Sequence, residues 1–119
     1  MFNPILEKIV SDCSGGLGAV LMGYDGIGIE QFCLDENPLN LDLVGIEYSN
    51  IAKEIRTAAE VLQIGALEEV TIKTDRFYLI IQSLTEEYFV ALVIERAGNF
   101  GQGRYLLRRE APALREALL

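Results

Sequence analysis

Histidine and tryptophan are absent from this 119-residue chain, and cysteine and proline are scarce. Without histidine the chain cannot build a Ser-His-Asp or Cys-His catalytic device, and it lacks the imidazole ligands of most zinc and iron sites. The two cysteines, Cys13 and Cys33, lie far apart without CxxC spacing, so they cannot complete a structural zinc site by themselves. A disulfide between them stays open from sequence, but a reduced protein is the favoured interpretation.

Positive charge is also in short supply. Ten Lys and Arg residues against eighteen Asp and Glu residues give a net charge of -8. This balance argues against nucleic acids and acidic membrane surfaces as partners. The arginines near the C-terminus form either a local docking patch or a solvated helix face. They are Arg104, Arg108, Arg109 and Arg115.

Long hydrophobic runs are missing as well. No stretch reaches the roughly 18 apolar residues that a membrane span needs. Charged residues at Glu7, Lys8 and Asp12 interrupt the start, so no signal peptide is predicted. Half of the residues are hydrophobic, which is ample for one core. We therefore expect a single cytoplasmic domain spanning 1–119.

Candidate catalytic and nucleotide-binding motifs are weak. The acidic pairs Asp35-Glu36, Glu68-Glu69 and Glu86-Glu87 fall in turns or at strand ends, where adjacent side chains diverge and do not converge as acid and base. Gly98, Gly101 and Gly103 form GxxGxG without the Lys-Ser or Lys-Thr of a P-loop, and we expect them to turn the chain into the last helix. The sequence predicts no catalytic residue, no metal site and no cofactor.

The apolar pattern predicts eight elements in the order helix, strand, strand, helix, strand, strand, strand, helix. Continuous apolar runs in the last two strands are typical of strands covered on both faces. The expected fold is therefore an α+β three-layer α/β/α sandwich with a five-stranded, mainly antiparallel sheet. The expected helices are 2–12, 41–64 and 104–119, and the expected strands are 18–22, 28–34, 68–74, 77–84 and 88–94.

The long helix 41–64 carries two stripes of residues along its length. One stripe consists of large apolar residues, and the other consists of small residues. Small residues at this spacing let another helix come close, or they are incidental. In strand 68–74, Val70 and Ile72 alternate with polar neighbours, which predicts a half-exposed strand. The apolar stripe is Val44, Tyr48, Ile51, Ile55, Ala58 and Leu62, and the small-residue stripe is Gly45, Ser49, Ala52 and Ala59, interrupted by Arg56.

This chain resembles the Roadblock / dynein light-chain family, and within it the bacterial MglB-type regulators of small Ras-like GTPases. The resemblance covers essentially the whole chain. It rests on the element order, the hairpin Gly23-Tyr24-Asp25-Gly26, the segment Ser49-Asn50-Ile51-Ala52, and the ending Gly98-Asn99-Phe100-Gly101 followed by Arg104-Tyr105-Leu106.

The resemblance implies a homodimer in which the second helices lie side by side and the third strands pair edge to edge. An uncovered edge strand is an aggregation liability, and such pairing would remove it. The implied function is a non-catalytic activator or co-regulator of a small Ras-like GTPase that binds the helical face. The implied dimer contacts are Gly45, Ser49, Ala52, Ala59, Val70, Thr71 and Ile72, and the implied GTPase contacts are Ser49, Lys53, Arg56 and Glu60.

Two other functions stay open. A dimeric scaffold without effect on GTP hydrolysis has the same sequence features as an activator. A small-molecule sensor needs an internal cavity, which the dense apolar strands disfavour because close packing fills the interior.

Overall fold

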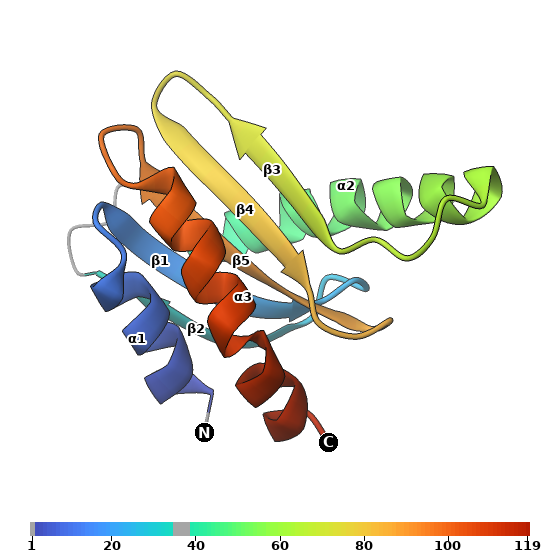
Figure 1. Ribbon diagram of the computed structural model, residues 1–119, viewed down its shortest axis with the longest axis horizontal. Helices are drawn as coiled ribbons and strands as arrows, with labels where there is room; N and C mark the ends of the chain where they lie inside the picture. Colours follow the sequence, from blue (N-terminus) through green and yellow to red (C-terminus); the bar gives the residue numbers. More distant parts are fainter. Residues whose placement is uncertain (1, 35–38) are drawn as a thin grey trace.

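The computed structural model describes residues 2–34 and 39–119 and has the expected order of elements (Figure 1). Of the helices in these residues, none has the length and hydropathy needed to cross a membrane. The helices are α1 (Asn3–Asp12), α2 (Leu41–Leu62) and α3 (Phe100–Ala117), and the strands are β1 (Gly16–Gly23), β2 (Gly28–Cys33), β3 (Glu69–Lys73), β4 (Phe77–Ser83) and β5 (Tyr88–Glu95).

The five strands form one sheet in the order β2-β1-β5-β4-β3, and every neighbouring pair is antiparallel. Helices α1 and α3 lie side by side on one face of the sheet, and α2 lies on the other (Figure 1). This arrangement confirms the predicted three-layer sandwich. It also leaves β2 and β3 as the two edges of the sheet.

Apolar residues fill both faces of the central strands. On the α1/α3 face, Leu21, Ile80 and Leu92 are fully buried. On the α2 face, Ile81 and Phe89 belong to a second buried cluster. A sheet that is apolar on both faces must be covered on both, which explains the two helical layers.

The last helix begins at Phe100 rather than at residue 104, which corrects the prediction for the glycine-rich segment. Asn99 caps the helix, and its Oδ1 accepts a hydrogen bond from the Gln102 N–H at 2.9 Å. Gly103 is buried inside the helix, where a Cβ atom would collide with Ile94 of the sheet. Glycine at this position therefore lets the helix approach the sheet closely. The other boundaries agree with the prediction or differ from it by at most two residues.

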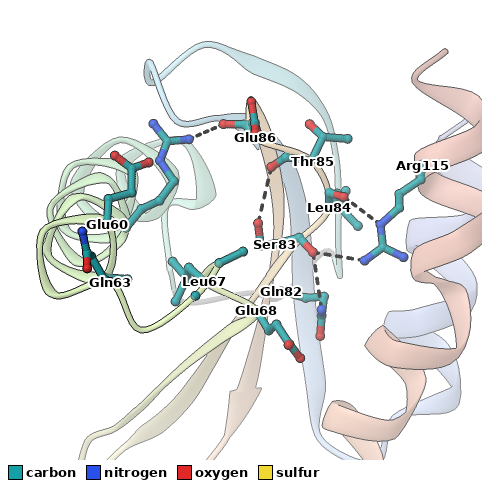
Figure 2. Close-up of a pocket in the computed structure, with 14 residues that line it drawn as sticks. Glu60, Gln63, Leu67, Glu68, Gln82, Ser83, Leu84, Thr85, Glu86 and Arg115 are labelled. Carbon is teal, nitrogen blue, oxygen red and sulfur yellow. Dashed lines mark hydrogen bonds between the residues drawn. The ribbon is translucent and has the colours of Figure 1, made fainter.

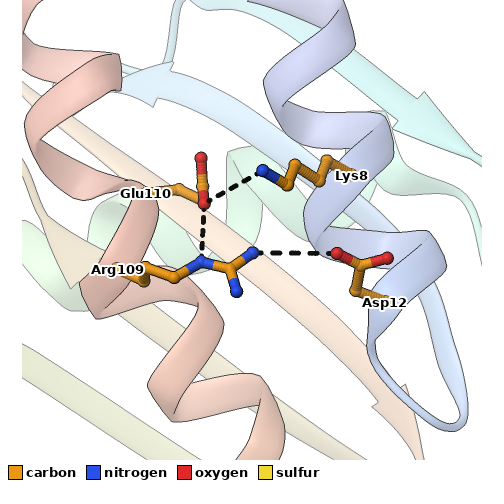
Figure 3. Close-up of polar contacts among 4 residues, drawn as sticks. All are labelled: Lys8, Asp12, Arg109 and Glu110. Atoms are coloured by element: carbon orange, nitrogen blue, oxygen red, sulfur yellow. Dashed lines mark hydrogen bonds and ion pairs between the residues drawn. The ribbon is translucent and has the colours of Figure 1, made fainter.

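Most of the arginines near the C-terminus have partners within the chain. Arg109 bonds Glu110 at 2.8 Å and pairs with Asp12 at 3.7 Å, and Lys8 reaches the same Glu110 carboxylate at 3.8 Å (Figure 3). Arg104 pairs with Glu69 at 2.9 Å, and Arg115 donates to the Leu84 carbonyl at 2.7 Å. These arginines fasten α3 to α1 and to the sheet. Because the ion pairs are largely at the surface, each contributes little to stability.

Two glycines flanking the start of α3 should respond differently to alanine. A Cβ at Gly98 would lie 2.6 Å from the Ser14 carbonyl oxygen and 2.9 Å from the Gly15 Cα, and backbone atoms cannot move aside cheaply. We expect Gly98→Ala to lower the free energy of unfolding by about 1–3 kcal/mol. Gly101→Ala is the matched control, because its Cβ would meet only the Asn99 Oδ1 at 3.7 Å. Urea denaturation of both variants measures the difference, and equal stabilities would contradict this packing.

Candidate interaction surface

Helix α2 is bounded by local signals at both ends. The Asn40 Oδ1 accepts a hydrogen bond from the Leu43 N–H at 3.2 Å, and Gln63 ends the helix in the left-handed conformation at φ 55°. The helix packs against β1 and β2, and its C-terminal half extends past the sheet (Figure 1). One part of α2 therefore covers the sheet, and another part projects from it.

The small-residue stripe of α2 faces the chain's own sheet. Gly45 lies so close to Met22 that a Cβ atom would collide with the Met22 side chain. Ser49 is only 1% exposed, and its hydroxyl donates to the Ile46 carbonyl at 2.8 Å. Ala52 and Ala59 are buried as well. These residues are already covered within one protomer, so little of this stripe is open for the predicted dimer contact.

The large apolar stripe of α2 is the side that lacks cover. Ile51 is 42% exposed, Ile55 36% and Leu62 66%. Ala58 on the same stripe is also exposed. Water contact with so many aliphatic side chains along one helix face is unfavourable, and such patches commonly mark interaction sites.

The N-terminal end of this stripe opens into an apolar groove. Val44 and Tyr48 of α2 line it on one side, and Ile72, Phe77 and Leu79 of the sheet line it on the other. Its volume is about 130 Å³. The groove lies beside β3 on the α2 face, so α2 leaves part of the apolar face near this edge uncovered. Because the lining of this groove is mostly apolar, an apolar side chain from another molecule could occupy it.

The outer edge of β3 offers unpaired backbone groups. Glu68 accepts from the Ser83 N–H at 2.8 Å and Thr74 donates to the Phe77 carbonyl at 2.9 Å, so the even-numbered residues bond β4. In an antiparallel strand, the N–H and C=O of Glu69, Thr71 and Lys73 therefore point outward. Within residues 2–34 and 39–119, no hydrogen bond reaches these groups.

The opposite edge of the sheet is protected by its own chain. At β2, the outward-pointing Gln31 C=O accepts a hydrogen bond from the Asn3 amide at 3.2 Å. The Gln31 N–H donates to the Glu30 carboxylate at 3.4 Å. Side chains occupy the middle of this edge and obstruct strand addition there. The two edges thus differ, and β3 is the one prepared to receive another strand.

The predicted GTPase contacts are only partly available. Lys53 and Glu60 are exposed on α2, whereas Ser49 is buried. The Arg56 guanidinium lies 4.1 Å from the centroid of the Tyr24 ring, and it donates to the Glu86 carbonyl. Arg56 therefore joins α2 to the β1–β2 hairpin and the β4–β5 turn, a role that the sequence pattern did not indicate.

A hollow of about 640 Å³ lies between the end of α2 and the end of α3 (Figure 2). Arg56 and Arg115 border it, and both donate to backbone carbonyls of the segment joining β4 to β5. Ser83 at its rim is hydrogen-bonded to the Tyr24 hydroxyl at 2.9 Å. The polar side chains of Arg56, Ser83 and Arg115 are thus engaged in holding the turn.

The two cysteines occupy contrasting environments, and both are free thiols. Cys13 is buried, and its burial raises the pKa of the thiol above its ordinary value. Cys33 is exposed on the edge strand β2. In the part of the chain that the structure describes, no group of three or more carboxylate or cysteine ligands is arranged for a metal ion.

Thiol labelling should separate these cysteines. The thiolate is the reactive species, so a raised pKa and burial should both slow the reaction of Cys13 at neutral pH. We expect Ellman's reagent to modify one thiol of the native protein rapidly and the second only on unfolding. Cys33→Ser should remove the rapid phase, and a rapid phase that persists in this variant would contradict the burial of Cys13.

Comparison with known proteins places this geometry in a family. No protein-family model matches the chain, and no curated protein matches it. Among solved structures, MglC from Myxococcus xanthus is 36% identical, with 96% of each chain covered and a TM-score of 0.70. A Roadblock/LC7 domain from Streptomyces avermitilis is 18% identical, covering 98% of this chain and 96% of that one, with a TM-score of 0.85. MglB from Thermus thermophilus is 19% identical, covering 95% and 84%, with a TM-score of 0.83.

The sheet order and the helical layers are those of a Roadblock/LC7 domain, as the resemblance in sequence implied. The chain belongs to the Roadblock/LC7 domain family. Within that family it is similar to MglC over nearly its full length.

Proposed function

We propose that this protein is a homodimeric, non-catalytic regulator of a small Ras-like GTPase. Membership of the Roadblock/LC7 family, with MglC and MglB among its structural neighbours, supports the regulatory class. The observation that carries the proposal is the open edge of β3 beside the uncovered apolar stripe of α2. Both features are open to a partner, and the groove between Tyr48 and Ile72 connects them.

In the proposed dimer, the β3 strands of two copies pair and join the sheets. Each α2 projects past its own sheet, so the apolar stripe of one copy can meet that of the other. Ile51, Ile55 and Leu62 would then leave water, and the groove beside Ile72 would be closed. Each buried aliphatic side chain contributes roughly 1.5–3 kcal/mol when burial is complete.

The outer face of α2 is the proposed GTPase-binding surface. It retains Lys53 and Glu60 from the predicted contacts, and exposed Leu43 and Ile46 lie near its N-terminal end. A mixture of apolar and charged side chains is typical of interfaces between independently folded proteins. The dimer would act by binding one conformation of the GTPase more tightly than another.

A dimeric scaffold is the second candidate, and the position of Arg56 favours it. An inserted arginine accelerates GTP hydrolysis about 10³–10⁵-fold in GTPase-activating proteins. Arg56 is instead stacked on Tyr24 and bonded to the Glu86 carbonyl. A scaffold would use the same surfaces and differ only in leaving the hydrolysis rate unchanged.

The dimer contact is tested by Ile55→Glu. This substitution places a charge on the exposed apolar stripe, so we expect a folded protein whose dimer dissociation constant rises by about 100-fold or more, because burying an unpaired carboxylate is costly. Thr57→Glu adds the same charge at an exposed position off this stripe and should leave the dimer intact. Sedimentation equilibrium measures both. An Ile55→Glu dimer as tight as the wild type would contradict the proposed contact.

The regulatory role is tested by single-turnover GTP hydrolysis of the cognate Ras-like GTPase with this protein in excess. Acceleration of about ten-fold, equivalent to about 1.4 kcal/mol in the barrier, would establish activation. Arg56→Ala should retain most of that acceleration if Arg56 is structural. Binding without acceleration would establish the scaffold, and absence of binding would contradict the proposed function.

A further inference from the structure

We propose that β3 selects a second copy of its own chain through opposite charges at its two ends. In this pairing Thr71 lies opposite Thr71 of the second copy, and Glu69 lies opposite Lys73. The inference rests on the proposed homodimer and adds to it a defined register and a basis for choosing the partner.

The backbone gives the first argument for this register. Three residues of β3 present outward N–H and C=O groups, which makes six open groups in each copy. When two such strands run antiparallel about Thr71, each outward residue lies opposite another outward residue. Residues in these positions exchange both of their hydrogen bonds. All six open groups of each strand are then satisfied.

The side chains give the second argument. Val70 and Ile72 lie opposite Ile81 and Leu79, which belong to the cluster on the α2 face. In the Thr71-centred register, Val70 of one copy meets Ile72 of the other, and this apolar layer continues across the interface. On the opposite face, the Glu69 carboxylate meets the Lys73 ammonium of the second copy, and symmetry repeats this pair.

Shifting the centre by one residue, to Val70 or Ile72, leaves two of the six outward groups without a partner on the facing strand and no longer places Glu69 opposite Lys73. Shifting it by two residues loses both advantages. Centring the pair on Glu69 opposes two carboxylates, and centring it on Lys73 opposes two ammonium groups. Both alternatives also leave most of the outward backbone groups without partners. Like charges directly opposite on neighbouring strands are destabilising, and opposite charges are favourable. The sequence Glu-Val-Thr-Ile-Lys is therefore self-complementary in one register.

Existing contacts already position the acidic member of the pair. The Glu69 carboxylate accepts from the Arg104 Nε at 2.9 Å and from the Thr71 hydroxyl at 3.1 Å. These bonds hold the Glu69 carboxylate on the α3 face of the strand and next to Thr71, the central residue of the proposed pairing. Lys73 lies on the same face, with its ammonium 4.8 Å from the centroid of the Phe100 ring. A related chain with a different charge pattern on this strand would lack the match.

Reversing the charges separately and together tests the proposal. Lys73→Glu creates a strand with two acidic ends, and Glu69→Lys creates one with two basic ends. We expect each variant alone to dimerise about ten-fold or more weakly than the wild type, because every cross-strand pair becomes repulsive. An equimolar mixture of the two should form heterodimers with affinity restored toward the wild-type value. The double variant Glu69→Lys/Lys73→Glu should form homodimers again.

A control separates this effect from a general effect of charge. Lys53→Glu makes the same charge change on α2, away from β3. It should dimerise within about two-fold of the wild type. Native mass spectrometry of differently tagged chains identifies the heterodimers, and circular dichroism confirms folding.

The outcomes separate the two levels of the proposal. A monomeric wild type would overturn the homodimer itself. A dimeric wild type whose single charge variants associate equally well, or a mixture that fails to form heterodimers, would overturn the charge selection and leave the homodimer standing.

Discussion

The structure depends on a sheet that is apolar on both faces and must be shielded from water on both. Two helices, α1 and α3, share one face, whereas α2 is alone on the other. A single helix lying over β1 and β2 leaves the apolar face toward β3 incompletely covered. The groove beside Ile72 follows from this incomplete cover, and it lies next to β3, whose outer edge is open because β3 is the last strand of the sheet. A second copy added at this edge would supply the missing cover.

The two stripes of α2 lie in different environments: the small residues pack against the sheet, and part of the large apolar stripe is exposed. Gly45, Ser49 and Ala52 carry little bulk, so the helix can lie close to Met22 and Val20 of the sheet. The larger side chains, including Ile51 and Ile55, then point along the exposed flank of the helix. Because α2 uses its smallest residues to contact the sheet, its larger apolar residues remain on the exposed flank. Packing within the protomer thus leaves an apolar surface on which a second copy can pack.

Much of the fold could be predicted from sequence because the strands are short, dense in apolar residues and separated by clear turns. The order of elements and the hairpin at Asp25-Gly26 followed from local patterns alone. The start of α3 could not be predicted in this way, because the glycines at 101 and 103 suggest a turn. In the structure, Gly103 lies inside the helix, where packing against Ile94 requires a small residue. The roles of the two α2 stripes were also hidden, since periodicity shows which residues share a face but not which face meets the sheet. The burial of Ser49 against the sheet is therefore invisible to periodicity, and the Arg56–Tyr24 contact joins residues too distant in sequence for any local signal.

We propose that two copies meet at the edge formed by β3, and amide hydrogen exchange is a direct test of this contact. The outward amides of Glu69, Thr71 and Lys73 should be protected at high protein concentration and exchange rapidly after dilution below the dimer dissociation constant. The outward amide of Cys33 on β2 serves as an internal reference and should exchange rapidly at both concentrations. Rapid exchange at Thr71 under conditions where the protein sediments as a dimer would contradict the claim.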